Sequence, residues 1–174
     1  VPPGSLVLVT GSSGYVGGRL VTLLLERGYR VRCLLRTPGK VASAPWHEHV
    51  EIVQGDVGED LTEAMVGVDA AFYLVHSIGS SVEWAEHDRI VAENFRRAAD
   101  EAGIRRIIYL GGLGDHSSGE LSEHLARRQE VGAELAGEPL QLLDLPAAQT
   151  RGRDRLRAVL DERAHDPRAR AARG

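Results

Sequence analysis

The sequence predicts an α/β fold in which a doubly wound parallel sheet of five to six strands lies between helices, in three layers. Two observations predict this fold. Short apolar runs alternate with amphipathic segments of helical period, as in a parallel sheet covered on both faces. Three glycines, Gly11, Gly14 and Gly17, stand between the first apolar run and the first amphipathic segment, where a strand turns directly into a helix.

Periodicity and turn residues place the elements along the chain. We expect strands at Leu6–Thr10, Val31–Leu35, Val50–Val53, Ala70–Val75, Ile104–Leu110 and Leu140–Leu145. We expect helices from about Tyr15 to Arg27, Glu59 to Val66, Ser80 or Ser81 to Ala102, and Glu123 to Ala136. In the third of these, the buried stripe is expected to comprise Ile90, Val91, Phe95 and Ala98. Residues 40–49 are expected to form a loop or a short helical turn.

Composition narrows the class of protein. The 174 residues allow one domain with a sizeable core. No apolar run approaches the ~18 residues that a membrane span needs, and no basic and then apolar leader is present, so we expect a cytoplasmic protein with no membrane partner. The single cysteine, Cys33, lies in an apolar run and is expected to be a buried thiol. We expect no metal site.

The glycine motif has a specific physical use after a buried strand. Gly11 can take the backbone angles of a tight turn. Gly14 lets a pyrophosphate approach the backbone, and Gly17 lets the helix pack close to the strand. The start of the helix then offers free N–H groups and a partial positive charge to phosphates. The sequence therefore predicts a dinucleotide site at the carboxyl ends of the strands.

The charges divide the chain into two parts. Residues 151–174 contain eight Arg and four acidic residues, whereas the whole chain has a net charge of −4. We therefore expect a dinucleotide-binding domain over residues 1–146 and an Arg-rich tail over residues 147–174, helical or disordered. The interspersed acids and the lack of aromatic residues in the tail argue against nucleic acid as a partner.

Five blocks of sequence together resemble a known family. They read TGSSGYVGG, RCLLRTP, QGDVGE, FYLVHS and IIYLGGLG, in this order along the chain. They resemble the atypical short-chain dehydrogenase/reductases, nearest to the NmrA-like NAD(P)-binding branch, over about residues 5–137. The resemblance implies a Rossmann-like fold, with NADP or NAD as the cofactor and an unknown small molecule as the substrate.

The resemblance implies roles for matching residues. The phosphate loop would be lined by Thr10, Gly11, Ser13, Gly14, Tyr15, Val16 and Gly17. Arg36 stands where related proteins select the cofactor, and an Arg there favours the 2′-phosphate of NADP. No Asp or Glu occurs between residues 31 and 45, which supports NADP. Alternatively, Arg36 is a solvated residue past the end of a strand.

The remaining binding residues follow the third and fourth strands. Asp56 and Val57 would lie against the adenine, and Leu74, Val75 and His76 would pass beneath the cofactor. An Asp after a Gly is also a common turn residue, so both interpretations of Asp56 stay open. His76 can equally be an ordinary histidine with satisfied hydrogen bonds.

The chain departs from the family at its catalytic residues. Active members use a Tyr-x-x-x-Lys pair, but Lys40 is the only lysine, and no tyrosine has a lysine four residues later. His124 and Arg128 stand at the two positions and would share one helix face. His124 could serve as the acid–base group, and Arg128 could hold the ribose or a phosphate. The alternative is an exposed polar helix face.

Three functions remain after this comparison. The first is an NADP-dependent oxidoreductase that acts on a carbonyl or a quinone. The second is a non-catalytic NAD(P)-sensing or protein-interaction module, and the third is a sugar-nucleotide epimerase. We expect the C-terminal substrate lobe to be lacking, as in a short binding module or in a truncated or frame-shifted end. A homodimer through the two long helices is an expectation that no residue proves.

Overall fold

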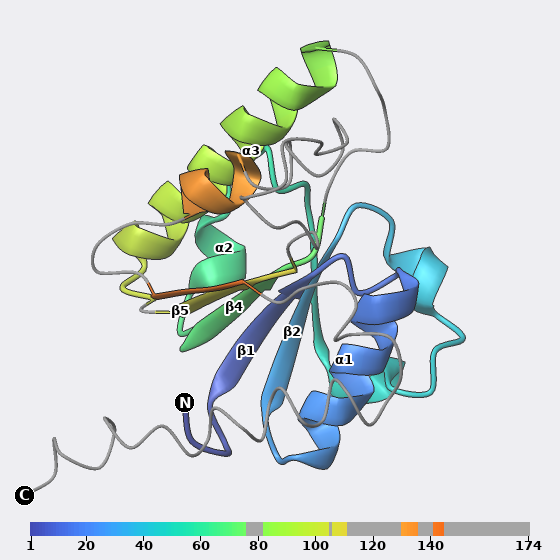
Figure 1. Ribbon diagram of the computed structural model, residues 1–174. Helices are drawn as coiled ribbons and strands as arrows, with labels where there is room; N and C mark the ends of the chain where they lie inside the picture. Colours follow the sequence, from blue (N-terminus) through green and yellow to red (C-terminus); the bar gives the residue numbers. More distant parts are fainter. Residues whose placement is uncertain (76–81, 105, 111–129, 136–140, 145–174) are drawn as a thin grey trace, which may run out of the picture.

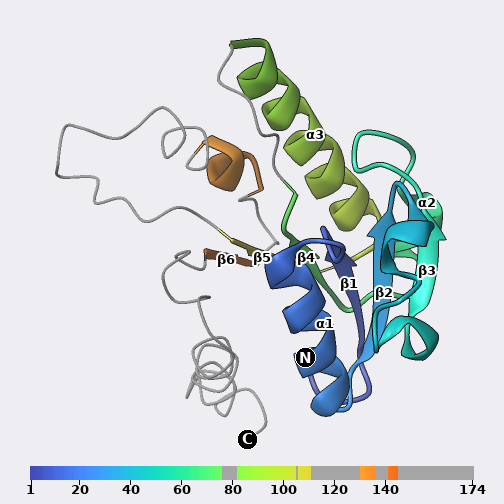
Figure 2. The same cartoon turned by 90° about the vertical axis from the view of Figure 1, so that its right-hand side faces the viewer.

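The fold is built on a six-stranded sheet whose strands are all parallel, in the order β3-β2-β1-β4-β5-β6 (Figures 1 and 2). The computed structural model describes residues 1–75, 82–104, 106–110, 130–135 and 141–144. The strands are β1 (Leu6–Thr10), β2 (Arg30–Leu35), β3 (Glu51–Gln54), β4 (Ala70–Tyr73), β5 (Arg106–Tyr109) and β6 (Gln141–Asp144). The predicted doubly wound parallel sheet is confirmed.

Helices cover both faces of the sheet (Figures 1 and 2). One face carries α1 (Tyr15–Glu26) and the segment with the short 3-10 helices η1 (Pro38–Val41) and η2 (His47–His49). The other face carries α2 (Thr62–Met65), α3 (Val82–Glu101) and a helical turn at residues 130–135. These are the three layers that the sequence predicts.

The core has two halves because the central strands are buried on both sides. All five residues of β1 are buried. Leu6 and Leu8 contact the α3 side, and Val7 and Val9 contact the α1 side. Adjacent strand residues point to opposite faces of a sheet, so a continuous apolar run fills both halves.

Strand and helix ends differ from the predictions by up to two residues, and two helices show larger differences. The helix expected from Glu59 begins at Thr62 instead, because the carboxylate of Asp60 accepts hydrogen bonds from the Thr62 N–H (2.9 Å) and hydroxyl (2.7 Å) and holds a turn there. In α3, the prediction that Ile90 is buried is wrong, since its side chain is 51% exposed. Ala92 is buried instead. Residues 90 and 92 are about 200° apart around the helix axis, so when Ala92 faces the core Ile90 faces away from it.

Within the described ranges, no helix has both the length and the apolar character that crossing a membrane would require.

Candidate functional site

The candidate site lies at the carboxyl ends of β1 and β4, where the direction of the strand order reverses (Figure 1). From β1 the chain proceeds outward through β2 to β3, and from β4 it proceeds the other way through β5 to β6. The loops at such a switch point diverge and leave a crevice, which is where ligands of open α/β sheets bind.

The glycine loop, residues 11–17, lies at the start of this crevice, and its glycines let backbone segments approach one another closely. Gly11 has a φ of +70°, and a Cβ there would lie 3.2 Å from the Leu74 carbonyl oxygen at the end of β4. A Cβ on Gly17 would lie 2.2 Å from the Gly11 carbonyl oxygen, which no side chain can tolerate. Both glycines are therefore required for the loop to fold back between β1 and α1 as it does.

The first turn of α1 is open to an anion. Gly14 is the N-cap residue, with extended backbone angles, and in the described part of the chain no side chain caps this end of α1. The first turn also contains no acidic residue. A Cβ on Gly14 would have only the Gly11 carbonyl oxygen within 4 Å, beyond its own chain neighbours. Exposed backbone N–H groups and open space fit a pyrophosphate.

The buried side chain of Thr10, at the end of β1, joins the start of the glycine loop to the end of β4 through hydrogen bonds. The side chain is fully buried, and its hydroxyl donates to the Phe72 carbonyl (3.1 Å) and accepts from the Leu74 N–H (3.0 Å). These bonds join Thr10, one residue past the last β1 residue that pairs with β4, to the end of β4 and to the residue that directly follows it. Leu74 and Val75 are half-buried and pack against opposite halves of the core. The predicted residues Thr10, Leu74 and Val75 therefore lie together beneath the loop.

The other predicted loop residues differ in exposure. Ser13 and Tyr15 are exposed, and Val16 is half-buried against the α1 side of the core. The guanidinium carbon of Arg19 lies 3.6 Å from the centroid of the Tyr15 ring. Sequence reasoning missed this cation beside the loop, although the i, i+4 spacing of the two residues was a signal for it.

Arg36 and Asp56 meet at the carboxyl ends of β2 and β3. Arg36 Nε lies 3.6 Å from Asp56 Oδ2. The two residues follow Leu35 and Gly55, and the Gly55 N–H donates a hydrogen bond to the Leu35 carbonyl at 3.1 Å. This bond continues the β2–β3 ladder by one step, so it sets the two side chains next to each other.

The loop after β3 holds Asp56 in a defined orientation. Asp56 Oδ1 accepts from the Gly58 N–H at 2.9 Å, which is the turn that the sequence left open as an alternative. Val57 is 8% exposed and packs in the core beneath α3. The turn and the position near Arg36 coexist, so the turn geometry does not remove Asp56 from the site.

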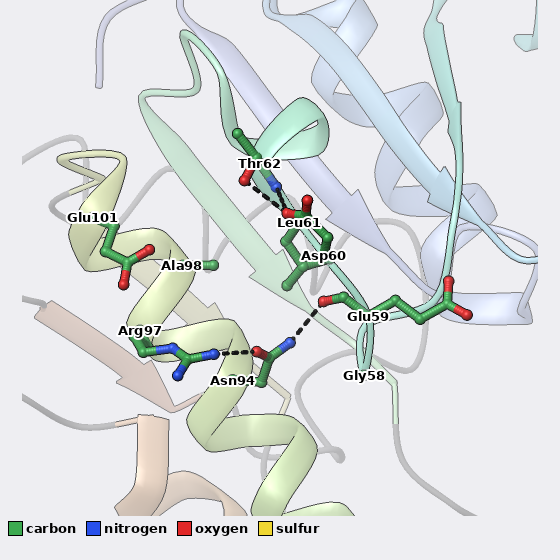
Figure 3. Close-up of a pocket in the computed structure, with 9 residues that line it drawn as sticks. All are labelled: Gly58, Glu59, Asp60, Leu61, Thr62, Asn94, Arg97, Ala98 and Glu101. Carbon is green, nitrogen blue, oxygen red and sulfur yellow. Dashed lines mark hydrogen bonds between the residues drawn. The ribbon is translucent and has the colours of Figure 1, made fainter.

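Asn94 of α3 fastens this loop from the other side (Figure 3). Its amide nitrogen donates to the carbonyls of Val57 (3.0 Å) and Glu59 (2.9 Å), and its amide oxygen accepts from Arg97 (3.0 Å). These contacts border a pocket of about 370 Å³ between the loop and α3. The glycine loop does not line this pocket.

Two buried tyrosines lie at the ends of β4 and β5. The ring of Tyr73 packs edge-on against Phe95 at 5.0 Å and lies 6.1 Å from the ring of Tyr109. Burial, with a smaller contribution from Asp88, raises the pKa of the Tyr73 hydroxyl above its ordinary value. Tyr73 is therefore neutral at physiological pH and is not a proton acceptor there.

Three predicted residues, His76, His124 and Arg128, lie outside the described residues. In the described ranges, no group of three or more His, Cys, Asp or Glu side chains is placed to hold a metal ion.

Comparisons with known proteins agree with this geometry. The model of a family described as NAD(P)H-binding matches residues 11–137. The chain is 37% identical over 115 residues to a 3-beta-hydroxysteroid dehydrogenase of Mycolicibacterium neoaurum, a match that covers 59% of this chain and 31% of that protein. The chain thus spans about a third of the length of the curated relatives that it matches.

Solved structures share the fold. A putative NAD-dependent epimerase/dehydratase from Bacillus halodurans superposes with a TM-score of 0.71 at 21% identity, covering 81% of this chain and 69% of that one. A triphenylmethane reductase of Citrobacter sp., in complex with NADP(H), superposes with a TM-score of 0.60 at 21% identity, covering 74% of this chain and 44% of that one.

The matched segment begins at the turn glycine Gly11 and includes the open first turn of α1 and the paired Arg36 and Asp56. The chain accordingly belongs to the NAD(P)H-binding family of Rossmann-fold proteins within the atypical short-chain dehydrogenase/reductases, and its cofactor is NAD(P).

Proposed function

We propose that this chain is the cofactor-binding part of an NADP-dependent oxidoreductase that acts on a carbonyl or a quinone. One observation carries the proposal: no side chain caps the first turn of α1, whose N-cap residue is Gly14. The close approach of Gly17 to the Gly11 carbonyl holds that turn where its N–H groups can bind a pyrophosphate. The names of two similar proteins, a hydroxysteroid dehydrogenase and a triphenylmethane reductase, support oxidoreduction. A hydroxysteroid dehydrogenase interconverts an alcohol and a ketone, which favours such a pair as the substrate class.

The preference for NADP rests on Arg36. Its side chain is 77% exposed at the carboxyl end of β2, and no acidic residue follows in the chain before residue 48. A carboxylate at this point would accept hydrogen bonds from the adenosine ribose, whereas a guanidinium attracts a 2′-phosphate. Asp56 and Val57, in the next loop, are proposed to line the adenine end of the site.

The proposed chemistry needs a hydride and a proton. When bound, NADPH would supply the hydride to the carbonyl carbon of the substrate. The carbonyl oxygen must then receive a proton, and we assign this role to His124, whose ordinary pKa of ~6.5 suits proton transfer near neutral pH. Arg128 is proposed to hold the ribose or a phosphate, since a guanidinium does not titrate.

A second candidate function is a non-catalytic NAD(P)-sensing or interaction module. The observation that favours it is the position of Lys40, the only lysine, which lies in η1 after β2 and not beside any tyrosine in sequence. The standard Tyr-x-x-x-Lys chemistry is therefore absent. A sugar-nucleotide epimerase is a weaker candidate for the same reason, although one structural neighbour carries the name epimerase/dehydratase.

The test has two stages. NADP⁺ and NAD⁺ are first titrated into the protein, followed by calorimetry; binding of neither would contradict the proposal. NADPH oxidation is then measured with ketosteroids, aliphatic and aromatic ketones, and quinones. We expect turnover that His124→Ala lowers by about 10²-fold or more, as for loss of a general acid. His49→Ala, an exposed histidine of η2, is the matched control. Binding without turnover would favour the sensing module.

A further inference from the structure

The structure pairs two residues that both lie at the adenosine end of the proposed site, and their charges are opposite. The Arg36 guanidinium is the group expected to attract the 2′-phosphate of NADP. Its Nε lies 3.6 Å from Oδ2 of Asp56, the carboxylate that pairs with it in the described part of the chain. A phosphate that binds Arg36 therefore enters the field of a carboxylate.

The two partners are held very differently. The Asp56 side chain is 33% exposed, and its Oδ1 is fixed by the Gly58 N–H at 2.9 Å. The Arg36 side chain is 77% exposed. The loop that carries Asp56 is itself fastened to α3 by Asn94 through the Val57 and Glu59 carbonyls. The carboxylate is thus a fixed charge, and the guanidinium is the partner that can turn.

The distance argues that Asp56 attracts Arg36 without orienting it. Charge-assisted N–H···O bonds measure about 2.7–2.9 Å, and the separation here is 3.6 Å. An ion pair of this length imposes no bidentate geometry that would present the guanidinium to a phosphate. It draws the guanidinium toward the β3 loop, and it offsets part of the positive charge.

We propose that Asp56 competes with the 2′-phosphate of NADP for Arg36, and so limits how strongly the site prefers NADP over NAD. The inference rests on the proposed use of Arg36 in cofactor selection. NAD lacks the 2′-phosphate, so the competition leaves its affinity nearly unchanged. Asp56 is in this sense a specificity-determining residue that acts against the phosphate.

Asp56→Asn tests the proposal with little disturbance of the loop. The amide oxygen of Asn can still accept the Gly58 N–H, because Asn and Asp form the same turn. We expect the ratio of the NAD⁺ to the NADP⁺ dissociation constant to rise by about two- to fivefold, the range that exposed ion pairs produce. Glu59→Gln is the matched control: it removes one carboxylate from the same loop, and the amide oxygen of Gln can still accept from the Asp56 N–H, as Glu59 Oε2 does at 3.3 Å.

A double-mutant cycle with Arg36→Ala separates the mechanism from a general charge effect. In the Arg36→Ala background, we expect Asp56→Asn to change the ratio by much less than it does when Arg36 is present. Calorimetric titration of each variant gives the constants, and thermal unfolding checks that each is folded.

Three results would overturn the proposal. The first is an unchanged or lowered ratio in Asp56→Asn, the lowered ratio being what an orienting role would give. The second is an equal change with and without Arg36. In both cases the unaltered protein binds NADP⁺, and the proposed function stands. The third is that the unaltered protein binds neither dinucleotide, which would overturn the proposed function as well.

Discussion

Gly17 is the residue whose lack of a side chain the loop needs most. A Cβ there would lie 2.2 Å from the Gly11 carbonyl oxygen and 2.8 Å from the Ser12 Cα, and both are backbone atoms. We predict that Gly17→Ala lowers the free energy of unfolding by about 3 kcal/mol or more, the upper end for overpacking, and abolishes dinucleotide binding. Urea denaturation and NADP⁺ titration measure the two effects.

Gly39→Ala serves as the control for that substitution. Gly39 is exposed in η1, and a Cβ there would have no atom within 4 Å beyond its chain neighbours. The free energy of unfolding of Gly39→Ala is expected to stay within about 0.5 kcal/mol of that of the unaltered protein. Equal effects of the two substitutions would contradict the role given to the close approach of Gly17.

Cys33 is buried in β2 with no exposed surface, as the sequence predicts. Burial raises the pKa of its thiol to about 11, and a contribution from Ser12 opposes this shift. At pH 8 only about one thiol in a thousand is then ionised, and the thiolate is the reactive form. We predict negligible alkylation by iodoacetamide in the folded protein and complete alkylation in 6 M guanidinium.

Because Cys33 is the only cysteine, the mass of the intact protein reports its modification without ambiguity. Rapid alkylation of the folded protein at pH 8 would contradict the buried position of β2.

At the scale of elements, Arg32 joins β2 to β3 and α2. Its side chain is 13% exposed. Its Nε and Nη2 donate to Glu51 Oε2 at 2.9 and 2.7 Å, and its Nη1 donates to the Val66 carbonyl at 2.7 Å and the Ala64 carbonyl at 3.1 Å. These carbonyls lie at the C-terminal end of α2, where the helix leaves them without internal partners. One side chain therefore satisfies the end of a very short helix.

The same contacts make stability depend on pH. Hydrogen bonding to Arg32 is the main cause that lowers the pKa of Glu51 from its ordinary 4.5. A lowered pKa in the folded state adds stability that is present above about pH 4.5 and is lost as the pH falls through the folded-state value. We predict that Glu51→Gln destabilises the protein at pH 7, and that the difference shrinks as the pH falls below 4.5.

Urea denaturation at pH 7 and below pH 4 measures this difference. Since the Glu51 side chain is 40% exposed, we expect it to stay below about 1 kcal/mol at pH 7. Glu48→Gln, at an exposed position in η2, is the control for the loss of one carboxylate. A Glu51→Gln effect that grows on acidification would contradict the assignment.

Sequence patterns predicted the bounds of the elements more accurately than they predicted which face of a helix is buried. The central apolar runs gave β1 without error and β2 to within one residue, because strands buried on both sides need continuous apolar residues. Gly28 and Gly103, which follow α1 and α3, have φ values of +77° and +72°, the left-handed conformation in which glycine commonly ends a helix. The buried face of α3 was misjudged at Ile90, because the helix turns Asp88 and Ala92 inward instead.

At the scale of the whole molecule, the site depends on two separate βα units meeting. Gly11 belongs to the first strand–helix turn, and Leu74 lies 63 residues later at the end of β4, yet a Cβ on Gly11 would lie only 3.2 Å from the Leu74 carbonyl oxygen. A ligand that spans the switch point contacts both units only when the chain is folded. We predict that NADP⁺ at 100 times its dissociation constant stabilises the protein by about 2.7 kcal/mol.

Thermal or urea unfolding with increasing NADP⁺ checks this prediction, and NAD⁺ at the same concentration is expected to stabilise less. AMP, which lacks the pyrophosphate and the second nucleotide, is the control for adenosine binding alone. Equal stabilisation by AMP and NADP⁺ at equal concentrations would contradict a site centred on the glycine loop.

The sequence by itself determined the sheet, its parallel strands and the glycine loop. These follow from local rules: apolar runs for buried strands, the 3.6-residue period for helices, and glycine where no Cβ fits. The resemblance to a family added the cofactor, which the match over residues 11–137 confirmed.

Only the tertiary structure decided which residues meet. The 3.6 Å approach of Arg36 to Asp56 depends on the pairing of β2 with β3, and the support of the 56–59 loop depends on where α3 places Asn94. Such contacts join residues 20 or more positions apart in sequence, and no local propensity encodes them. Packing of the two βα units against one sheet brings them together.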